Sequence, residues 1–304
     1  MGVPEPSRSV FVCTQDGLRI HVREFGPRSA PGLPVVCLPG LTRTTADFDS
    51  LAPRLAGARR LIAIDSRGRG QSDYDPNPQN YNAAVELSDV MRVLAALAIG
   101  PAVFVGSSRG GILTMLLAAA AHPPAVVGAV LHDIGPVIEP QGIARIQTYV
   151  GKLPHPASFA ESAEILRQLF EPQFPKLSPE QWLSAARRTW KIEGGALVPT
   201  YDPRLAEAFG KTNSDQPPPT LWNEFDALAG VPVLVIRGAN SDILSVATVS
   251  AMRNRHRDLE WIEVANQGHV PLLEGGELLD RIARFVEKCE RVHRNVQADL
   301  FPSQ

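Results

Sequence analysis

Short runs of apolar, mostly β-branched residues recur along the chain and alternate with longer segments of helical periodicity. Such runs are typical of buried strands, and they lie at 35–38, 61–64, 102–105, 127–131, 233–236 and 261–264. Helical periodicity is found near 48–55, 83–97, 108–121, 243–252 and 277–290. Strands that alternate with helices in this way predict an α/β fold with a doubly wound, mostly parallel sheet.

The two ends of the chain extend this pattern. Residues 10–12 and 19–25 flank the turn Gln15-Asp16-Gly17, which predicts an N-terminal antiparallel hairpin and therefore a sheet of eight strands. In the last helix, one face is apolar and is expected to pack on the sheet. Its residues are Leu278, Leu279, Ile282, Phe285, Val286 and Cys289.

The alternation of strands and helices fails between about 135 and 225. This stretch holds 12 of the 27 prolines and no convincing strand, so it is predicted to be a helical insertion after the sixth strand. The predicted organisation is a core of residues 1–134 and 226–304 with an inserted helical cap of residues 135–225. The expected cap helices lie at 143–150, 158–170, 179–190 and 203–209. Pro217-Pro218-Pro219 is expected to form a stiff return to the core.

Composition limits the partners to be expected. The 304 residues carry a formal net charge of −2, which gives no reason to expect nucleic acid or an anionic membrane as a partner. No apolar run approaches the ~20 residues of a membrane-spanning helix, and the first residues lack a signal-peptide pattern. The three cysteines, Cys13, Cys37 and Cys289, do not indicate a disulfide framework, so a cytoplasmic location is expected.

The most specific chemical signal follows the strand at 102–105. There the chain reads Gly106-Ser107-Ser108-Arg109-Gly110 and continues into a helix. A Gly-x-Ser-x-Gly turn between a strand and a helix lifts the serine Oγ clear of the backbone, and the start of the helix offers N–H groups to an oxyanion. Ser108 is therefore a candidate nucleophile, although a serine that only caps the helix would show the same pattern.

A serine nucleophile needs a base to take its proton and an acid to orient that base. His269 follows the strand at 261–264, and Asp242 follows the strand at 233–236. The order Ser108, Asp242, His269 is the order found in α/β-hydrolases and differs from the other triad orders.

Further motifs strengthen a resemblance to the α/β-hydrolase superfamily over almost the whole chain. The Pro-Gly-Leu at 39–41 resembles the oxyanion turn of that family, the Asp-Ser-Arg-Gly-Arg-Gly-Gln-Ser at 65–72 resembles its Asp-x-Arg-Gly-x-Gly-x-Ser loop, and the Gly-His at 268–269 resembles its histidine loop. The resemblance implies an α/β-hydrolase fold, a cap that covers the active site, and an oxyanion hole formed by the backbone N–H groups of Leu41 and Arg109.

Two positions depart from the family pattern. Pro39 stands where many relatives have His, and Arg109 stands where Met, Leu or Gln is common. The oxyanion hole needs only backbone N–H groups, so it can survive both changes. The Arg109 side chain is expected to form an ion pair behind the site rather than to contact an anionic substrate.

The acid has a rival candidate. Some relatives place it after the strand that here ends near 131, which makes Asp133 an alternative to Asp242. Asp242 is favoured because its loop has the usual family spacing to the histidine.

These residues predict a serine hydrolase that cleaves a carboxylic ester or lactone of a small, largely apolar substrate through an acyl-enzyme. No dinucleotide fingerprint, phosphate loop or metal-ligand spacing occurs, so no cofactor and no metal is expected. Most aromatic residues of the cap, among them Phe170 and Trp182, are expected to pack the core of the cap itself rather than to line a substrate pocket. Two alternatives stay open: a carbon–carbon bond hydrolase with the same triad, and a ligand receptor of the same fold with very slow turnover.

Overall fold

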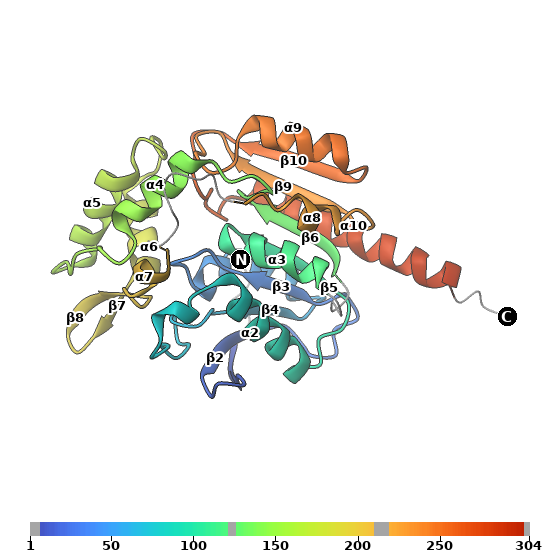
Figure 1. Cartoon of the computed structure of the whole chain (residues 1–304), viewed down its shortest axis with the longest axis horizontal. Coiled ribbons are helices and arrows are strands. Elements are labelled where there is room, and N and C mark those ends of the chain that lie inside the picture. The colour runs from blue at the N-terminus through green and yellow to red at the C-terminus, as the bar shows by residue number, and fades with distance from the viewer. Residues whose placement is uncertain (1–6, 121–125, 210–218, 301–304) are drawn as a thin grey trace.

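An eight-stranded sheet forms the centre of the molecule (Figure 1). The computed structural model describes residues 7–120, 126–209 and 219–300, so Pro217 and Pro218 of the predicted return lie outside the described residues. In sheet order, the strands are β1 (Arg8–Cys13), β2 (Arg19–Phe25), β4 (Leu61–Ile64), β3 (Val35–Leu38), β5 (Ala102–Ser107), β6 (Val126–His132), β9 (Val233–Gly238) and β10 (Leu259–Val264). Only the pairings of β2 with β1 and with β4 are antiparallel, which confirms the predicted mostly parallel sheet.

Helices cover both faces of the sheet, because successive residues of each buried strand point to opposite faces. In β3, Val35 and Cys37 belong to the apolar cluster of α1 (Ala52–Leu55) and α10 (Gly276–Leu300). Val36 and Leu38 pack with α2 (Ala83–Ala96) and α3 (Arg109–Ala119). The predicted helix at 48–55 is divided into a 3₁₀ turn and a short α-helix. The helical elements of the core are η1 (Thr45–Phe48), α1 (Ala52–Leu55), η2 (Pro78–Asn80), α2 (Ala83–Ala96), α3 (Arg109–Ala119), α8 (Trp222–Asp226), α9 (Val246–Arg255) and α10 (Gly276–Leu300).

The insertion between β6 and β9 contains helices and one hairpin, and lies beside the sheet (Figure 1). The expected absence of strands is wrong, because Gly194 and Gly195 both adopt positive φ, of 57° and 83°, and allow a tight turn between two short strands. The predicted core boundary at 226 falls inside α8, which packs on α3. The elements of the insertion are α4 (Pro140–Tyr149), α5 (Phe159–Phe170), α6 (Pro179–Thr189), β7 (Trp190–Glu193), β8 (Ala196–Pro199) and α7 (Leu205–Phe209).

Aromatic residues of the insertion form a small core of their own. Trp182, Trp190 and Phe174 are almost fully buried and pack together with Leu166 and Leu197. This agrees with the expectation that most cap aromatics serve packing. No helix in the described ranges is both long and apolar enough to cross a membrane.

The parallel strands β5, β6 and β9 end at one edge of the sheet. Ser107 at the end of β5 lies opposite His132 at the end of β6, and His132 lies opposite Ile236 of β9. The residues that directly follow β5 and β6 are Ser108 and Asp133, so the topology brings two chemically competent side chains to neighbouring strand ends.

Candidate active site

Ser108 occupies a sharp turn between β5 and α3. Its backbone has φ 48° and ψ −113°, a conformation that non-glycine residues rarely adopt. The two flanking glycines are required by close packing: a Cβ at Gly106 would lie 2.5 Å from the Gly110 carbonyl oxygen, and a Cβ at Gly110 would lie 1.9 Å from the Leu38 carbonyl oxygen. The turn thus has the form that the Gly-x-Ser-x-Gly pattern predicts.

The side chains of Ser108, His269 and Asp133 form one hydrogen-bonded chain. Ser108 Oγ lies 2.8 Å from His269 Nε2, and His269 Nδ1 lies 2.8 Å from Asp133 Oδ2. Because a carboxylate only accepts, Nδ1 carries the proton and Nε2 is left to accept from the serine hydroxyl. The histidine and aspartate side chains are 6% and 0% exposed, so water scarcely competes for these bonds.

Asp133 is held firmly by the end of the neighbouring strand. Its Oδ1 accepts from the Gly238 N–H at 2.7 Å, and its Oδ2 accepts from the Ser241 hydroxyl at 2.7 Å. Its own N–H donates to the Ile236 carbonyl at 2.7 Å, and its φ is 55°. These contacts fix the carboxylate toward His269, and the positive φ directs it away from the line of β6.

The sequence prediction that Asp242 orients His269 is wrong. Asp242 instead makes a two-point ion pair with Arg145 of α4, with N–O distances of 2.6 and 2.9 Å. Burial opposes ionisation of Asp242, but the Arg145 guanidinium outweighs burial and lowers its pKa. In the loop after β9, Ser241 donates a hydrogen bond to Asp133, whereas Asp242 connects the loop to the insertion through its ion pair with Arg145.

The turn at 39–41 lies against the nucleophile. A Cβ at Gly40 would lie 3.6 Å from Ser108 Cβ, and the Leu41 carbonyl is held by the Arg69 guanidinium at 2.7 Å. Among the described residues, no acceptor is found for the N–H of Leu41 or of Arg109. Both N–H groups are therefore left without an acceptor in the described residues, and their place in an oxyanion hole stays a prediction.

The Arg109 side chain forms the predicted structural ion pair. Its Nε donates to Glu86 Oε2 at 2.7 Å, and the second oxygen of Glu86 lies 2.9 Å from Arg69 Nη1. Glu86 and Arg69 are fully buried. The side chain of Arg109 is thereby turned toward α2, and only its backbone remains for chemistry.

Replacement of Glu86 by Ala is expected to destabilise the protein strongly. The substitution leaves the buried Arg69 without its compensating charge, and breaking a buried ion pair in this way costs about 3–5 kcal/mol. Urea unfolding measures the change. Glu164→Ala, which breaks an ion pair on the exposed side of α5, is the matched control and should leave the midpoint unchanged; equal midpoints for both variants would contradict the assigned role of Glu86.

The loop at 65–72 is held in place by buried polar contacts to several elements. Asp65 accepts from the Thr45 N–H at 2.7 Å and pairs with His21 Nδ1 at 2.7 Å, while Arg67 pairs with Asp89 through two bonds of 2.7 Å. These buried contacts join the loop to β2, η1 and α2.

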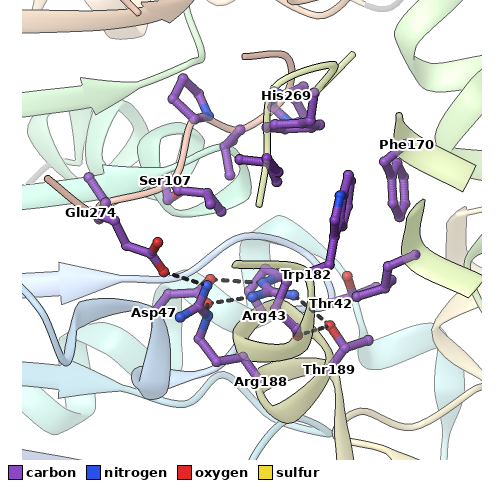
Figure 2. Close-up of a pocket in the computed structure, with 18 of the residues that line it drawn as sticks. Thr42, Arg43, Asp47, Ser107, Phe170, Trp182, Arg188, Thr189, His269 and Glu274 are labelled. Carbon is purple, nitrogen blue, oxygen red and sulfur yellow. Dashed lines mark hydrogen bonds and ion pairs between the residues drawn. The ribbon is translucent and has the colours of Figure 1, made fainter. Parts of the chain in front are cut away.

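A cavity of about 140 Å³ lies between the core and the insertion. Figure 2 shows Ser107 and His269 at one end of the cavity and an ionic cluster at the other end. Trp182 and Phe170 of the insertion line the side of the cavity. The cluster consists of Arg43 with Asp47 and Arg188 with Glu274, paired at 2.6 and 2.9 Å, and Thr189 accepts a further bond from Arg43 at 3.0 Å. In the described part of the chain, no group of three or more His, Cys, Asp or Glu is placed to hold a metal ion.

Comparisons with known proteins agree with this fold. A model described as "Alpha/beta hydrolase family" matches residues 35–281. An α/β hydrolase from Novosphingobium aromaticivorans superposes with a TM-score of 0.87 at 39% identity, covering 94% of this chain and 100% of that one. The chain therefore belongs to the α/β hydrolase family.

Two curated relatives have named activities. The chain is 34% identical over 263 residues to 3-hydroxybutyrate-oligomer hydrolase of Cupriavidus necator, which covers 83% of this chain and 87% of that protein. It is 26% identical over 253 residues to 2-(acetamidomethylene)succinate hydrolase of Mesorhizobium japonicum. That match covers 83% of this chain and 85% of the relative. These relatives are hydrolases with different named substrates.

Proposed function

We propose that this protein is a serine hydrolase that cleaves carboxylic esters through an acyl-enzyme. The observation that carries the proposal is the pair of 2.8 Å hydrogen bonds from Ser108 Oγ through His269 to Asp133. In this arrangement a neutral histidine can take the serine proton while the aspartate stabilises the imidazolium that forms. Asp133 takes the role that the sequence analysis gave to Asp242.

The proposed reaction has two halves. Ser108 Oγ attacks the ester carbonyl carbon as its proton passes to His269 Nε2, and the N–H groups of Leu41 and Arg109 stabilise the oxyanion. When the tetrahedral intermediate collapses, the ester C–O bond breaks and the leaving alcohol takes the proton from His269. Water that gives its proton to His269 then attacks the acyl carbon and releases the acid, which restores Ser108.

The cavity supports a small, largely apolar substrate. Its volume of about 140 Å³ suits a short acyl group, and its walls include Leu166, Phe170 and Trp182 from the insertion. We propose that the insertion, predicted as residues 135–225, acts as the cap over this site. Because a relative is named as a 3-hydroxybutyrate-oligomer hydrolase, esters of hydroxyacids join simple esters and lactones as the substrates to test.

The test is labelling with a fluorophosphonate probe and peptide mapping, together with hydrolysis of p-nitrophenyl acetate, butyrate and octanoate. We expect the label on Ser108 and faster turnover of the shorter esters, with Ser108→Ala as the unlabelled control. Turnover without a label on Ser108 would overturn the assigned nucleophile. A labelled Ser108 without turnover of any ester would contradict the esterase and favour a carbon–carbon bond hydrolase or a slow ligand receptor.

A further inference from the structure

One residue that lines the cavity has a buried hydrogen-bonding atom with no partner in the part of the chain that the structure describes. His132 is 1% exposed, its Nδ1 lies 3.0 Å from Ser107 Oγ, and its Nε2 has no hydrogen-bond partner among the described residues. Other buried side-chain atoms in the described residues also lack a hydrogen-bond partner, but among them only His132 Nε2 belongs to a residue that lines this cavity. The backbone of Pro271 lies near the ring but does not meet hydrogen-bond geometry. Since such an atom costs free energy when left unpaired, it marks a place for a polar ligand atom.

The position of this pair relates it to the reacting carbonyl. Ser107 and His132 are opposite each other on β5 and β6, and each directly precedes a member of the Ser108–His269–Asp133 chain. The Ser108 N–H also donates to the His132 carbonyl at 2.9 Å. Ser107 and His132 also line the same cavity as His269, so a group bound at His132 lies in the cavity that contains the proposed base.

The pair offers an uncharged partner. Burial lowers the pKa of His132 to about 4, although the charges of Asp133 and Asp47 act in the opposite direction, so the imidazole is neutral near pH 7. The charged residues elsewhere in the cavity are already paired with one another, as Arg43 is with Asp47. The unpaired Nε2 of His132 is therefore suited to a neutral polar atom rather than to a carboxylate.

A hydroxyl group fits this site better than a carbonyl oxygen. If the Ser107 hydroxyl donates to Nδ1, Nε2 carries the proton and donates; if Nδ1 donates to Ser107, Nε2 accepts. A hydroxyl can serve as acceptor in the first case and as donor in the second. A carbonyl oxygen can pair only with the first tautomer.

We propose that His132, held by Ser107, binds a hydroxyl group on the acyl part of the substrate, so that the enzyme prefers esters of short hydroxyacids. The proposal rests on the ester-hydrolase function above and specifies its substrate class. The acyl unit with a free hydroxyl is the hydroxyl-terminal unit of an oligoester. Ser108 would take that unit, the next unit would leave as the alcohol, and water would release one hydroxyacid and an oligomer shortened by one unit.

The test compares kcat/KM for p-nitrophenyl 3-hydroxybutyrate and p-nitrophenyl butyrate, each divided by its uncatalysed rate in the same buffer. One hydrogen bond to a buried neutral group should give the wild type a preference of about tenfold for the hydroxy ester. His132→Phe, which keeps a ring and removes the nitrogen atoms, should bring the ratio near one. His155→Phe changes an exposed histidine outside the cavity and should keep the wild-type ratio.

A second variant covers the case in which His132→Phe does not fold. Ser107→Ala removes the partner of Nδ1 and should reduce the preference while leaving His132 in place. A wild-type ratio near one, or a ratio unchanged in both variants, would overturn the proposed hydroxyl site while leaving the esterase intact. Equal losses on both esters would assign His132 a structural role. Absence of hydrolysis of every ester, with Ser108 unlabelled, would instead count against the proposed function itself.

Discussion

Asp133→Asn is expected to lower kcat for ester hydrolysis by about 10⁴-fold, the loss seen when a triad aspartate is neutralised. The carboxylate accepts from His269 Nδ1 at 2.8 Å, so it keeps Nε2 free to take the Ser108 proton. An amide at this position can present its N–H₂ to the ring and favour the opposite tautomer. Steady-state kinetics on p-nitrophenyl butyrate measure the change.

Asp242→Asn is the matched control for this experiment. Both aspartates follow neighbouring parallel strands, but Asp242 pairs with Arg145 and makes no hydrogen bond to His269. Neutralising the Asp242 carboxylate should weaken the ion pair between the β9 loop and α4. Because this carboxylate contributes positioning rather than proton transfer, kcat should stay within about tenfold of the wild type. A larger loss from Asp242→Asn than from Asp133→Asn would restore the sequence-based assignment.

Folding must be followed in the same two variants. The Asp133 carboxylate also accepts from the Gly238 N–H and from Ser241, and an asparagine oxygen can keep only part of this set. The thermal midpoint therefore falls somewhat in Asp133→Asn. A normal KM, together with a cooperative unfolding transition above the assay temperature, separates loss of chemistry from loss of structure.

The strands were predictable because their signal is local. A strand buried on both faces is a continuous apolar run, and β3 and β4 begin and end where their runs do. The elbow at Ser108 was predictable because Gly106 and Gly110 stand two residues to either side of the serine in one short pattern, although the close contact at Gly110 comes from Leu38, which is distant in the sequence. The hairpin β7–β8 was missed because its strands have only four residues each and are partly exposed.

The choice of acid depended on information that is not local. Both β6 and β9 end beside the histidine loop, and either following aspartate keeps the order serine, acid, histidine. Which one reaches His269 is decided by the backbone: Asp133 turns through a positive φ, whereas Asp242 lies farther along its loop and meets Arg145 from the insertion. A pairing across such a distance in sequence leaves no spacing pattern, although the position of Asp133 two residues after an apolar run was a usable signal.

Ser108→Ala and Ser108→Gly should both abolish ester turnover, with kcat lower by about 10⁶-fold, but they should differ in stability. Ser108 has φ 48° and ψ −113°, and a side chain in such a conformation costs about 1–3 kcal/mol. Alanine keeps that strain, so its thermal midpoint should stay near the wild-type value. Glycine removes it, at the expense of about 0.5–1 kcal/mol for a more flexible unfolded chain, so Ser108→Gly should melt at a higher temperature.

Calorimetry of the three proteins side by side tests whether the elbow stores strain for catalysis. A glycine variant that is inactive and more stable than both others means that the fold holds the serine in an unfavourable conformation, which the protein retains because that conformation directs Oγ toward His269. A glycine variant less stable than the alanine variant would mean that the turn is unstrained at this residue. Retained turnover in the alanine variant would remove Ser108 from the reaction, because no other hydroxyl among the described residues hydrogen-bonds His269.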